Sequence, residues 1–129
     1  GLPTVIQRWT LAGNLVATLK GHRAPVTSVF PTEARLFSSS SDCRVLVWEA
    51  DFCTSVLRHD RDLSTLAVHP TDTDMVVTGC YDGFVRVWQA STATCTVALD
   101  CRGDGVVDVA VLSSGDFVTL ATSGKLGTW

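Results

Sequence analysis

Two stretches decide the fold: Arg44-Val45-Leu46-Val47-Trp48 and Phe84-Val85-Arg86-Val87-Trp88. They share one residue pattern. Each places valine at every second position and ends in tryptophan. Alternation with a period of two, carried by β-branched and aromatic residues, is typical of β-strands. Ser39-Ser40-Ser41-Asp42 precedes the first stretch and Tyr81-Asp82-Gly83 precedes the second. Because Asp-Gly between strand-like runs is a strong hairpin signal, both stretches are predicted to be later strands of hairpins.

The tryptophans show that this design repeats. Trp9, Trp48, Trp88 and Trp129 are separated by 39, 40 and 41 residues (48−9, 88−48 and 129−88). A period near 40 is typical of propeller blades or of helical repeats. No part of the sequence carries a sustained apolar stripe at helical spacing, so the period indicates blades.

Each repeat is predicted to contain four strands joined by short polar connections. The whole chain, residues 1–129, is read as a single partial β-propeller with repeat units at about 10–48, 49–88 and 89–129, preceded by one strand of an earlier blade at 3–9. The predicted strands are 15–20, 26–30, 35–39 and 44–48, then 54–58, 64–68, 75–79 and 84–88, and finally 94–99, 106–112, 116–121 and 125–129.

Several short motifs together resemble the WD40 repeat family. The first repeat carries Gly21-His22, residues 26–31, 38–42 and 45–48; the second carries His69-Pro70, residues 78–83 and 85–88. The resemblance covers nearly the whole chain, and it implies an all-β fold: a WD40-type β-propeller segment of about three four-stranded blades. In this family the strand after the tryptophan joins the sheet of the preceding blade.

The resemblance also implies a hydrogen-bonded network inside a blade, made by a histidine, a serine, the turn aspartate and the tryptophan. Carried over to the first repeat, that network consists of His22, Ser40, Asp42 and Trp48. A buried indole is only a donor and needs such an acceptor, so the assignment is chemically reasonable.

The other repeats depart from this network. The second keeps Asp82 and Trp88, with Cys80 at the serine position. The third keeps only Trp129, with Ser123 at the aspartate position. These later blades are expected to rely more on apolar packing.

The number of blades leaves two expectations open. Propellers typically close with four to eight blades, and this chain encodes about three. Either the chain is part of a larger propeller, or copies of it pair through open sheet edges to close a ring.

Composition narrows the class of partner. The net charge is −3, and only Lys20 and Lys125 are lysines, so nucleic acid is not expected as the main partner. No apolar run is long enough to insert into a membrane. The five cysteines are odd in number and lack paired spacing, which indicates free thiols in an intracellular protein, cytoplasmic or nuclear.

Catalytic and metal signals are weak. His59-Asp60-Arg61-Asp62 is the densest cluster of titratable side chains, and it is interpreted as a solvated loop. No serine stands in a Gly-x-Ser-x-Gly motif, and no phosphate-binding glycine loop is present. The three histidines fall at spacings unsuited to a metal. We expect no enzyme activity, cofactor or metal.

Protein recognition remains as the expected function. Members of the WD40 family usually bind partners through loops at one rim, near the turn aspartate. The chain is therefore predicted to be a non-catalytic protein–protein interaction scaffold in an intracellular multiprotein complex; the alternative is a self-assembling structural module that closes a ring with its own copies. The rim residues that the resemblance selects as candidates for binding proteins or peptides are Tyr81, Arg23, Arg61, Asp62 and Arg44.

Overall fold

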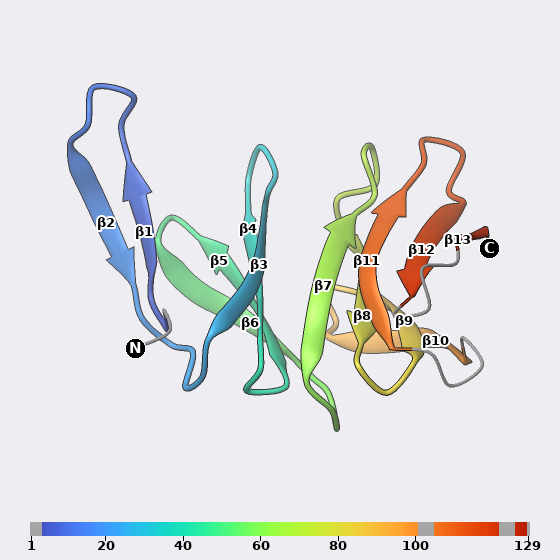
Figure 1. Cartoon of the computed structure of the whole chain (residues 1–129). Helices are drawn as coiled ribbons and strands as arrows, with labels where there is room; N and C mark the ends of the chain where they lie inside the picture. The colour runs from blue at the N-terminus through green and yellow to red at the C-terminus, as the bar shows by residue number, and fades with distance from the viewer. Residues whose placement is uncertain (1–3, 101–104, 122–125, 129) are drawn as a thin grey trace.

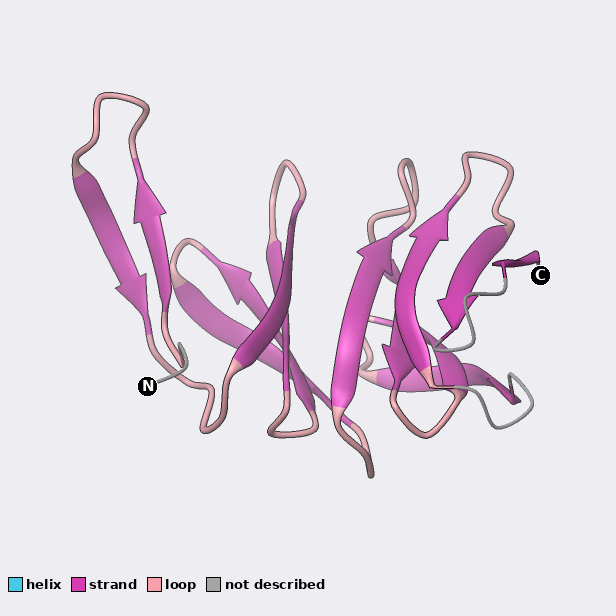
Figure 2. Ribbon diagram, in the orientation of Figure 1, coloured by secondary structure: helices cyan, strands magenta, loops and turns pink. Residues whose placement is uncertain are grey.

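The computed structural model describes residues 4–100, 105–121 and 126–128. Within these ranges the chain forms strands and no helix (Figure 2). The strands are β1 Ile6–Trp9, β2 Leu15–Leu19, β3 Val26–Pro31, β4 Leu36–Ser40, β5 Arg44–Glu49, β6 Phe52–Arg58, β7 Leu63–Val68, β8 Met75–Cys80, β9 Phe84–Gln89, β10 Thr94–Asp100, β11 Val106–Val111, β12 Phe117–Ala121 and β13 Leu126–Thr128.

These strands confirm the predicted all-β fold. The strand predicted at 3–9 is found at Ile6–Trp9, and each other predicted strand has a counterpart whose ends, within the described residues, differ by at most two residues, as with 54–58 against Phe52–Arg58. The agreement is close because alternating valines and tight polar turns define strands locally.

Two complete four-stranded antiparallel sheets form the middle of the molecule, β3-β4-β5-β6 and β7-β8-β9-β10. A two-stranded sheet, β1-β2, precedes them and a three-stranded sheet, β11-β12-β13, follows them. Each complete sheet includes the strand that follows its tryptophan, because β6 pairs with β5 and β10 pairs with β9. The sheets are therefore blades of the kind that the family resemblance implies.

The blades stand side by side, with their first strands adjacent. β7 lies between β3 and β11 and contacts both, as Figure 1 shows. The connections β2–β3, β4–β5, β6–β7 and β8–β9 all lie at the lower edge of Figure 1, which we call the lower rim. Loops distant in sequence are thereby gathered on one surface.

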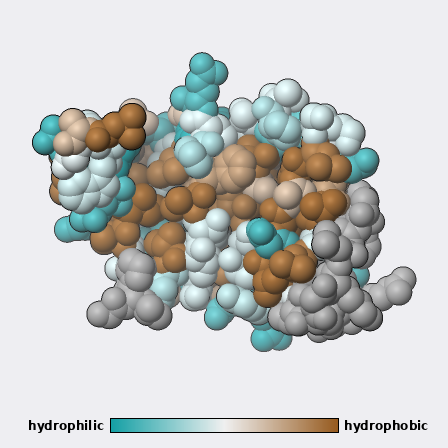
Figure 3. All heavy atoms as spheres, turned by 45° about the horizontal axis from the view of Figure 1, so that its top comes forward, coloured by the Kyte–Doolittle hydropathy of each residue, from teal (hydrophilic) through white to brown (hydrophobic). Residues whose placement is uncertain are grey.

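Apolar side chains between successive blades form the core. Figure 3 shows that apolar residues also form a band across the sheets on one face of the molecule, with polar residues toward both rims. One cluster joins the first complete blade to the second, and another joins the second to β11 and β12. The first of these contains Phe37, Val45, Val47, Leu57, Leu63, Leu66, Val68, Val76, Cys80, Trp88 and Ala90.

Gly79 on β8 marks a place where two blades pack closely. A Cβ at this position would lie 2.7 Å from Cγ1 of Val106 and 3.0 Å from Cγ2 of Thr65. We expect Gly79→Ala to lower the free energy of unfolding by about 2 kcal/mol, because overpacking forces neighbouring groups apart. Urea denaturation measures the change.

A second substitution tests that explanation. Val106→Ala removes the nearest carbon, so the double variant should lose less stability than the sum of the two single variants. Strictly additive losses would contradict a steric cause at Gly79.

Candidate functional site

A buried chain of hydrogen bonds holds the lower rim of the first complete blade. The Trp48 indole donates from Nε1 to Ser38 Oγ at 3.0 Å, and Ser38 Oγ lies 2.7 Å from His22 Nε2. His22 Nδ1 lies 2.9 Å from Oδ2 of Asp42. Since the Asp42 carboxylate can only accept, the His22 ring donates to it from Nδ1, and Nε2 of the neutral ring then accepts from the Ser38 hydroxyl. This chain connects a core tryptophan to the loop that follows β2.

The serine of this network is Ser38, and the prediction of Ser40 is wrong. Ser38 is opposite Leu46 in the β4–β5 ladder, which places it on the same face as Trp48. Ser40 stands at the end of β4, where its hydroxyl donates to the Ala24 carbonyl at 2.9 Å and accepts from the Asp42 amide at 3.0 Å. Ser40 therefore shapes the turn and does not contact the indole.

Asp42 is the anchor of the adjacent loops. Its Oδ2 accepts from the Arg23 amide and from the Arg44 guanidinium, both at 2.9 Å. Burial raises the pKa of Asp42, but hydrogen bonds from the Arg23 amide and Arg44, together with His22, outweigh this effect and lower it to about 2. The carboxylate therefore stays ionised and fixes two neighbouring loops.

The prediction that Arg44 is a free binding side chain on the rim is corrected by these contacts. Its guanidinium also donates to the Gly21 carbonyl, and only 13% of its side chain is exposed. Arg44 braces the loop from inside because the ionised Asp42 attracts it.

A second network occupies the next blade, where the sequence predicted only Asp82 and Trp88 as members. The Trp88 indole donates to Thr78 Oγ1 at 3.2 Å, and Thr78 Oγ1 lies 2.8 Å from His59 Nε2. His59 Nδ1 lies 3.3 Å from the Leu57 carbonyl, which takes the place of the carboxylate. His59 also packs on Trp88 with ring centroids 4.7 Å apart. The interpretation of His59 as part of a solvated loop is therefore wrong.

Asp82 does not contact His59, although it was predicted to share a network with Trp88. Its Oδ1 accepts from the Phe84 amide at 2.9 Å, and its Oδ2 lies 3.4 Å from Arg86. His59 Nδ1 already has a hydrogen-bond partner in the Leu57 carbonyl. The Asp82 carboxylate is therefore not needed as its acceptor and lies at the rim.

The signal that sequence reasoning missed is a hydroxyl residue ten positions before the tryptophan. Ser38 precedes Trp48 and Thr78 precedes Trp88 by this spacing. Thr119 precedes Trp129 by the same spacing (129−119 = 10). Trp129 and Ser123 themselves lie outside the described residues.

Three of the candidate binding residues meet around one hollow. Arg61, Asp62 and Tyr81 line an open depression of about 520 Å³ at the lower rim, together with Asp60 and Asp82. The Tyr81 side chain projects from the β8–β9 turn, and this residue is 55% exposed. The hollow thus combines an exposed aromatic ring with charges of both signs.

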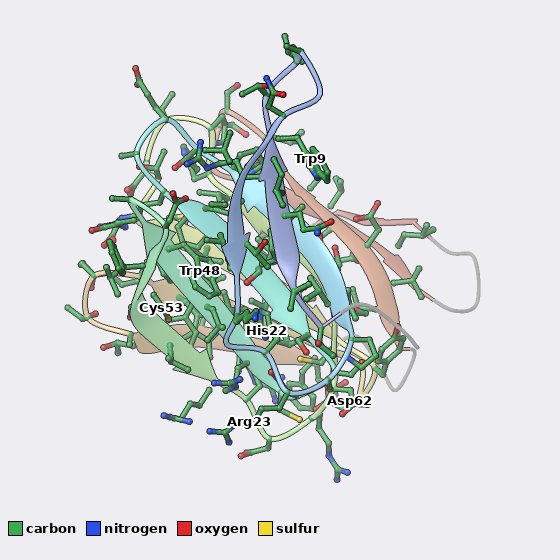
Figure 4. The ribbon with its side chains drawn as sticks, turned by 90° about the vertical axis from the view of Figure 1, so that its left-hand side faces the viewer. Trp9, His22, Arg23, Trp48, Cys53 and Asp62 are labelled. Carbon is green, nitrogen blue, oxygen red and sulfur yellow. The ribbon has the colours of Figure 1, made fainter. Side chains whose placement is uncertain are left out.

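A backbone contact joins the two loops of this hollow, and a thiol contact ties one of them to the β4–β5 turn. The Tyr81 amide donates to the Asp62 carbonyl at 3.3 Å. The Cys43 thiol donates to Oδ1 of Asp62 at 3.6 Å. Arg23 is exposed and lies at the same lower edge as Asp62 in Figure 4, but it does not line the hollow.

The chemistry of these groups is structural. Ser38, His22 and Asp42 are connected in the order of a hydrolytic triad, but Ser38 is fully buried and its oxygen already accepts from Trp48. In the part of the chain that the structure describes, no group of three or more histidine, cysteine, aspartate or glutamate side chains is placed to hold a metal ion. The same residues include no helix of the length and apolarity that a membrane span requires.

Comparison with known proteins identifies the class. The family model of the WD40 repeat, described as WD domain, G-beta repeat, matches residues 13–49 and 51–89. The chain belongs to the WD40 repeat family. These matched segments include both hydrogen-bonded networks and the Tyr81 turn.

Relatives that align with most of this chain are less than 30% identical to it in sequence. Nuclear distribution protein nudF of Aspergillus niger is 28% identical over 125 residues, which is 91% of this chain and 28% of that protein. COMPASS component SWD3 of Saccharomyces cerevisiae is 29% identical over 109 residues, which is 77% of this chain and 35% of that protein. The chain thus spans about a third or less of the length of these relatives.

Proposed function

We propose that this chain is a non-catalytic scaffold for protein–protein interaction in an intracellular multiprotein complex, and that it binds partners through the loops of its lower rim. The observation that supports the proposal is the hollow in which Arg61, Asp62 and Tyr81 meet. A hydrogen bond from the Tyr81 amide to the Asp62 carbonyl joins its two loops, which favours rim loops that are ordered before a partner arrives. Such preorganisation reduces the entropy lost on binding.

The names of two relatives support the class of function. SWD3 is named as a component of COMPASS, and a probable coatomer subunit beta' of Schizosaccharomyces pombe is 33% identical over 66 residues. Both names describe parts of larger assemblies. By analogy, the proposal assigns this chain to an assembly as well.

Tyr81 is proposed as the principal binding residue, with Arg61, Asp62 and Arg23 around it. Tyrosine and arginine are enriched among interface residues that carry most of the binding energy. A tyrosine that is 55% exposed has apolar surface to lose when a partner covers it.

Tyr81→Ala is expected to weaken partner capture at least tenfold, which is the loss typical of an interface hot spot. The measurement is quantitative affinity capture from cell extract, with the recovered proteins identified and titrated. Phe52→Ala is the matched control, because Phe52 is a 74% exposed aromatic residue on β6 and outside the hollow. Equal capture by both variants and by the unchanged chain would remove Tyr81 from the interface.

Self-association is the second candidate function, and exposed apolar side chains at both ends favour it. Trp9, Leu15 and Val16 are exposed on β1 and β2, and Leu120 is exposed on β12. Light scattering at several concentrations under reducing conditions tests this candidate. A discrete dimer would support ring closure by copies, and a concentration-independent monomer would exclude it.

A further inference from the structure

The hollow at the lower rim is framed by two connections between strands. The β6–β7 connection contributes Asp60, Arg61 and Asp62, and the β8–β9 turn contributes Tyr81 and Asp82. Both connections lie at the lower edge of Figure 1, and all four strands that they join belong to the two complete sheets. Three carboxylates, one guanidinium and one phenol ring therefore surround a depression of about 520 Å³.

Two of these carboxylates keep oxygens that no protein group occupies. Asp60 is exposed, and it forms neither a hydrogen bond nor an ion pair with any residue that the structure describes. Asp62 is also exposed and uses only Oδ1, which accepts from the Cys43 thiol at 3.6 Å. Asp60 and Asp62 thus offer acceptor oxygens to a donor from another molecule.

Neither arginine at the hollow neutralises its carboxylates. Arg61 lines the hollow but forms no ion pair in the described part of the chain. Arg86 approaches Asp82 at 3.4 Å, which is long for an ion pair. The same guanidinium donates to Sγ of Cys80 at 3.1 Å and lies over the Phe84 ring. A cation that enters the hollow therefore meets carboxylates without a closely bound partner.

The Tyr81 ring adds an aromatic surface, and together with the charges it selects the kind of group that fits. An anionic group would be repelled by three carboxylates, and an apolar side chain would bury them without partners. A cation is attracted both by the carboxylates and by the face of the exposed ring. A guanidinium suits the hollow better than an ammonium, because its planar fork can bond to carboxylates while it stacks on a ring.

We propose that the lower-rim hollow binds an arginine side chain from a basic segment of the partner protein. The guanidinium donates to the carboxylates of Asp60 and Asp62 and lies against the ring of Tyr81. This inference rests on the proposed rim-binding function and adds to it the chemistry of the partner.

The test uses a short glycine–serine peptide with one central arginine, together with three copies that carry citrulline, lysine or glutamate at that position. Each peptide is titrated into the 129-residue chain at low ionic strength, and the amide resonances of Asp62 and Tyr81 are followed by NMR. Citrulline keeps the shape of arginine without its charge, so binding should weaken at least about tenfold. The lysine peptide should bind between these two, and the glutamate peptide should bind most weakly.

Asp60→Asn should weaken binding of the arginine peptide about fivefold, the loss expected for one exposed charge pair. Glu33→Gln is the matched control, because it removes the same charge from an exposed residue of the β3–β4 loop, at the opposite edge in Figure 1. This control variant should bind the arginine peptide as the unchanged chain does.

Three results would overturn the arginine site while leaving the rim-binding function intact. These are no saturable shift up to about 10 mM arginine peptide, equal binding of the arginine and citrulline peptides, and equal losses for Asp60→Asn and Glu33→Gln. Tightest binding of the glutamate peptide would overturn it in favour of an acidic partner. Failure of the rim-binding function itself has a different sign, namely capture from cell extract that Tyr81→Ala leaves unchanged.

Discussion

Ser38→Ala is expected to lower the free energy of unfolding by about 3 kcal/mol, the largest loss from any single hydroxyl in the first complete blade. The substitution leaves two buried groups without partners, the Trp48 indole N–H and His22 Nε2. Ser38 has no solvent exposure, so water does not replace the missing hydroxyl. The measurement is urea denaturation followed by tryptophan fluorescence and by circular dichroism.

Two companion variants make this result specific. Ser40→Ala removes an equally buried hydroxyl, but one that bonds only to the Ala24 carbonyl and the Asp42 amide in the turn, so about 1 kcal/mol is expected. Ser38→Thr should retain most of the stability, because Thr78 performs the same role in the next blade. Equal losses for Ser38→Ala and Ser40→Ala would contradict the network described here.

The protein is expected to lose stability in acid in two separate steps, and His59 is responsible for the first. Burial lowers the pKa of His59 to about 4 from its ordinary value of 6.5, with the charge of Arg86 adding to the effect and the Leu57 carbonyl, Asp82 and Asp60 opposing it. As the pH falls from 6.5 to 4, the unfolded chain binds a proton at His59 that the folded chain does not. Stability therefore falls over this window, by about 3 kcal/mol at most.

Asp42 makes the main contribution to the second step, although hydrogen bonds from Arg8 and from Ser91 also lower the pKa values of Asp51 and Asp74. The pKa of Asp42 is lowered from 3.8 to about 2, so its contribution is present above pH 3.8 and is lost as the pH falls through 2. The two windows scarcely overlap, which allows each group to be tested by itself.

Denaturation midpoints measured from pH 7 to pH 2 separate the two groups. His59→Gln, which removes the titrating ring, should flatten the dependence between pH 6.5 and 4. Asp42→Asn should leave that slope intact and reduce the dependence below 3.8, where Asp51 and Asp74 still contribute. If His59→Gln retained the full slope between 6.5 and 4, the buried neutral state of His59 would be refuted.

Local pattern was sufficient for the strands and for part of the first network. Valine alternation, the polar turns and the spacing of Trp9, Trp48 and Trp88 predicted the sheets, because strand and turn preferences act over a few neighbouring residues. His22, Asp42 and Trp48 were each assigned from the family pattern, and the structure brings them together through one hydroxyl.

The identity of that hydroxyl could not be read from the turn. Ser38, Ser39 and Ser40 are consecutive and chemically identical, and only the β4–β5 register decides which of them faces Trp48. The partners of His59 could not be predicted from the sequence either. Thr78 is 19 residues away, and the other partner is a backbone carbonyl, which every residue has.

The sequence by itself determined the repeat, the strands and the candidate rim residues, since each depends on short-range pattern and on family resemblance. The tertiary structure decided how those residues are used. Arg44 is drawn inward by Asp42, whereas Tyr81, Arg61 and Asp62 meet around a hollow, because pairing of distant strands sets which loops become neighbours. Burial then decides which polar groups must satisfy one another and which remain available at the surface.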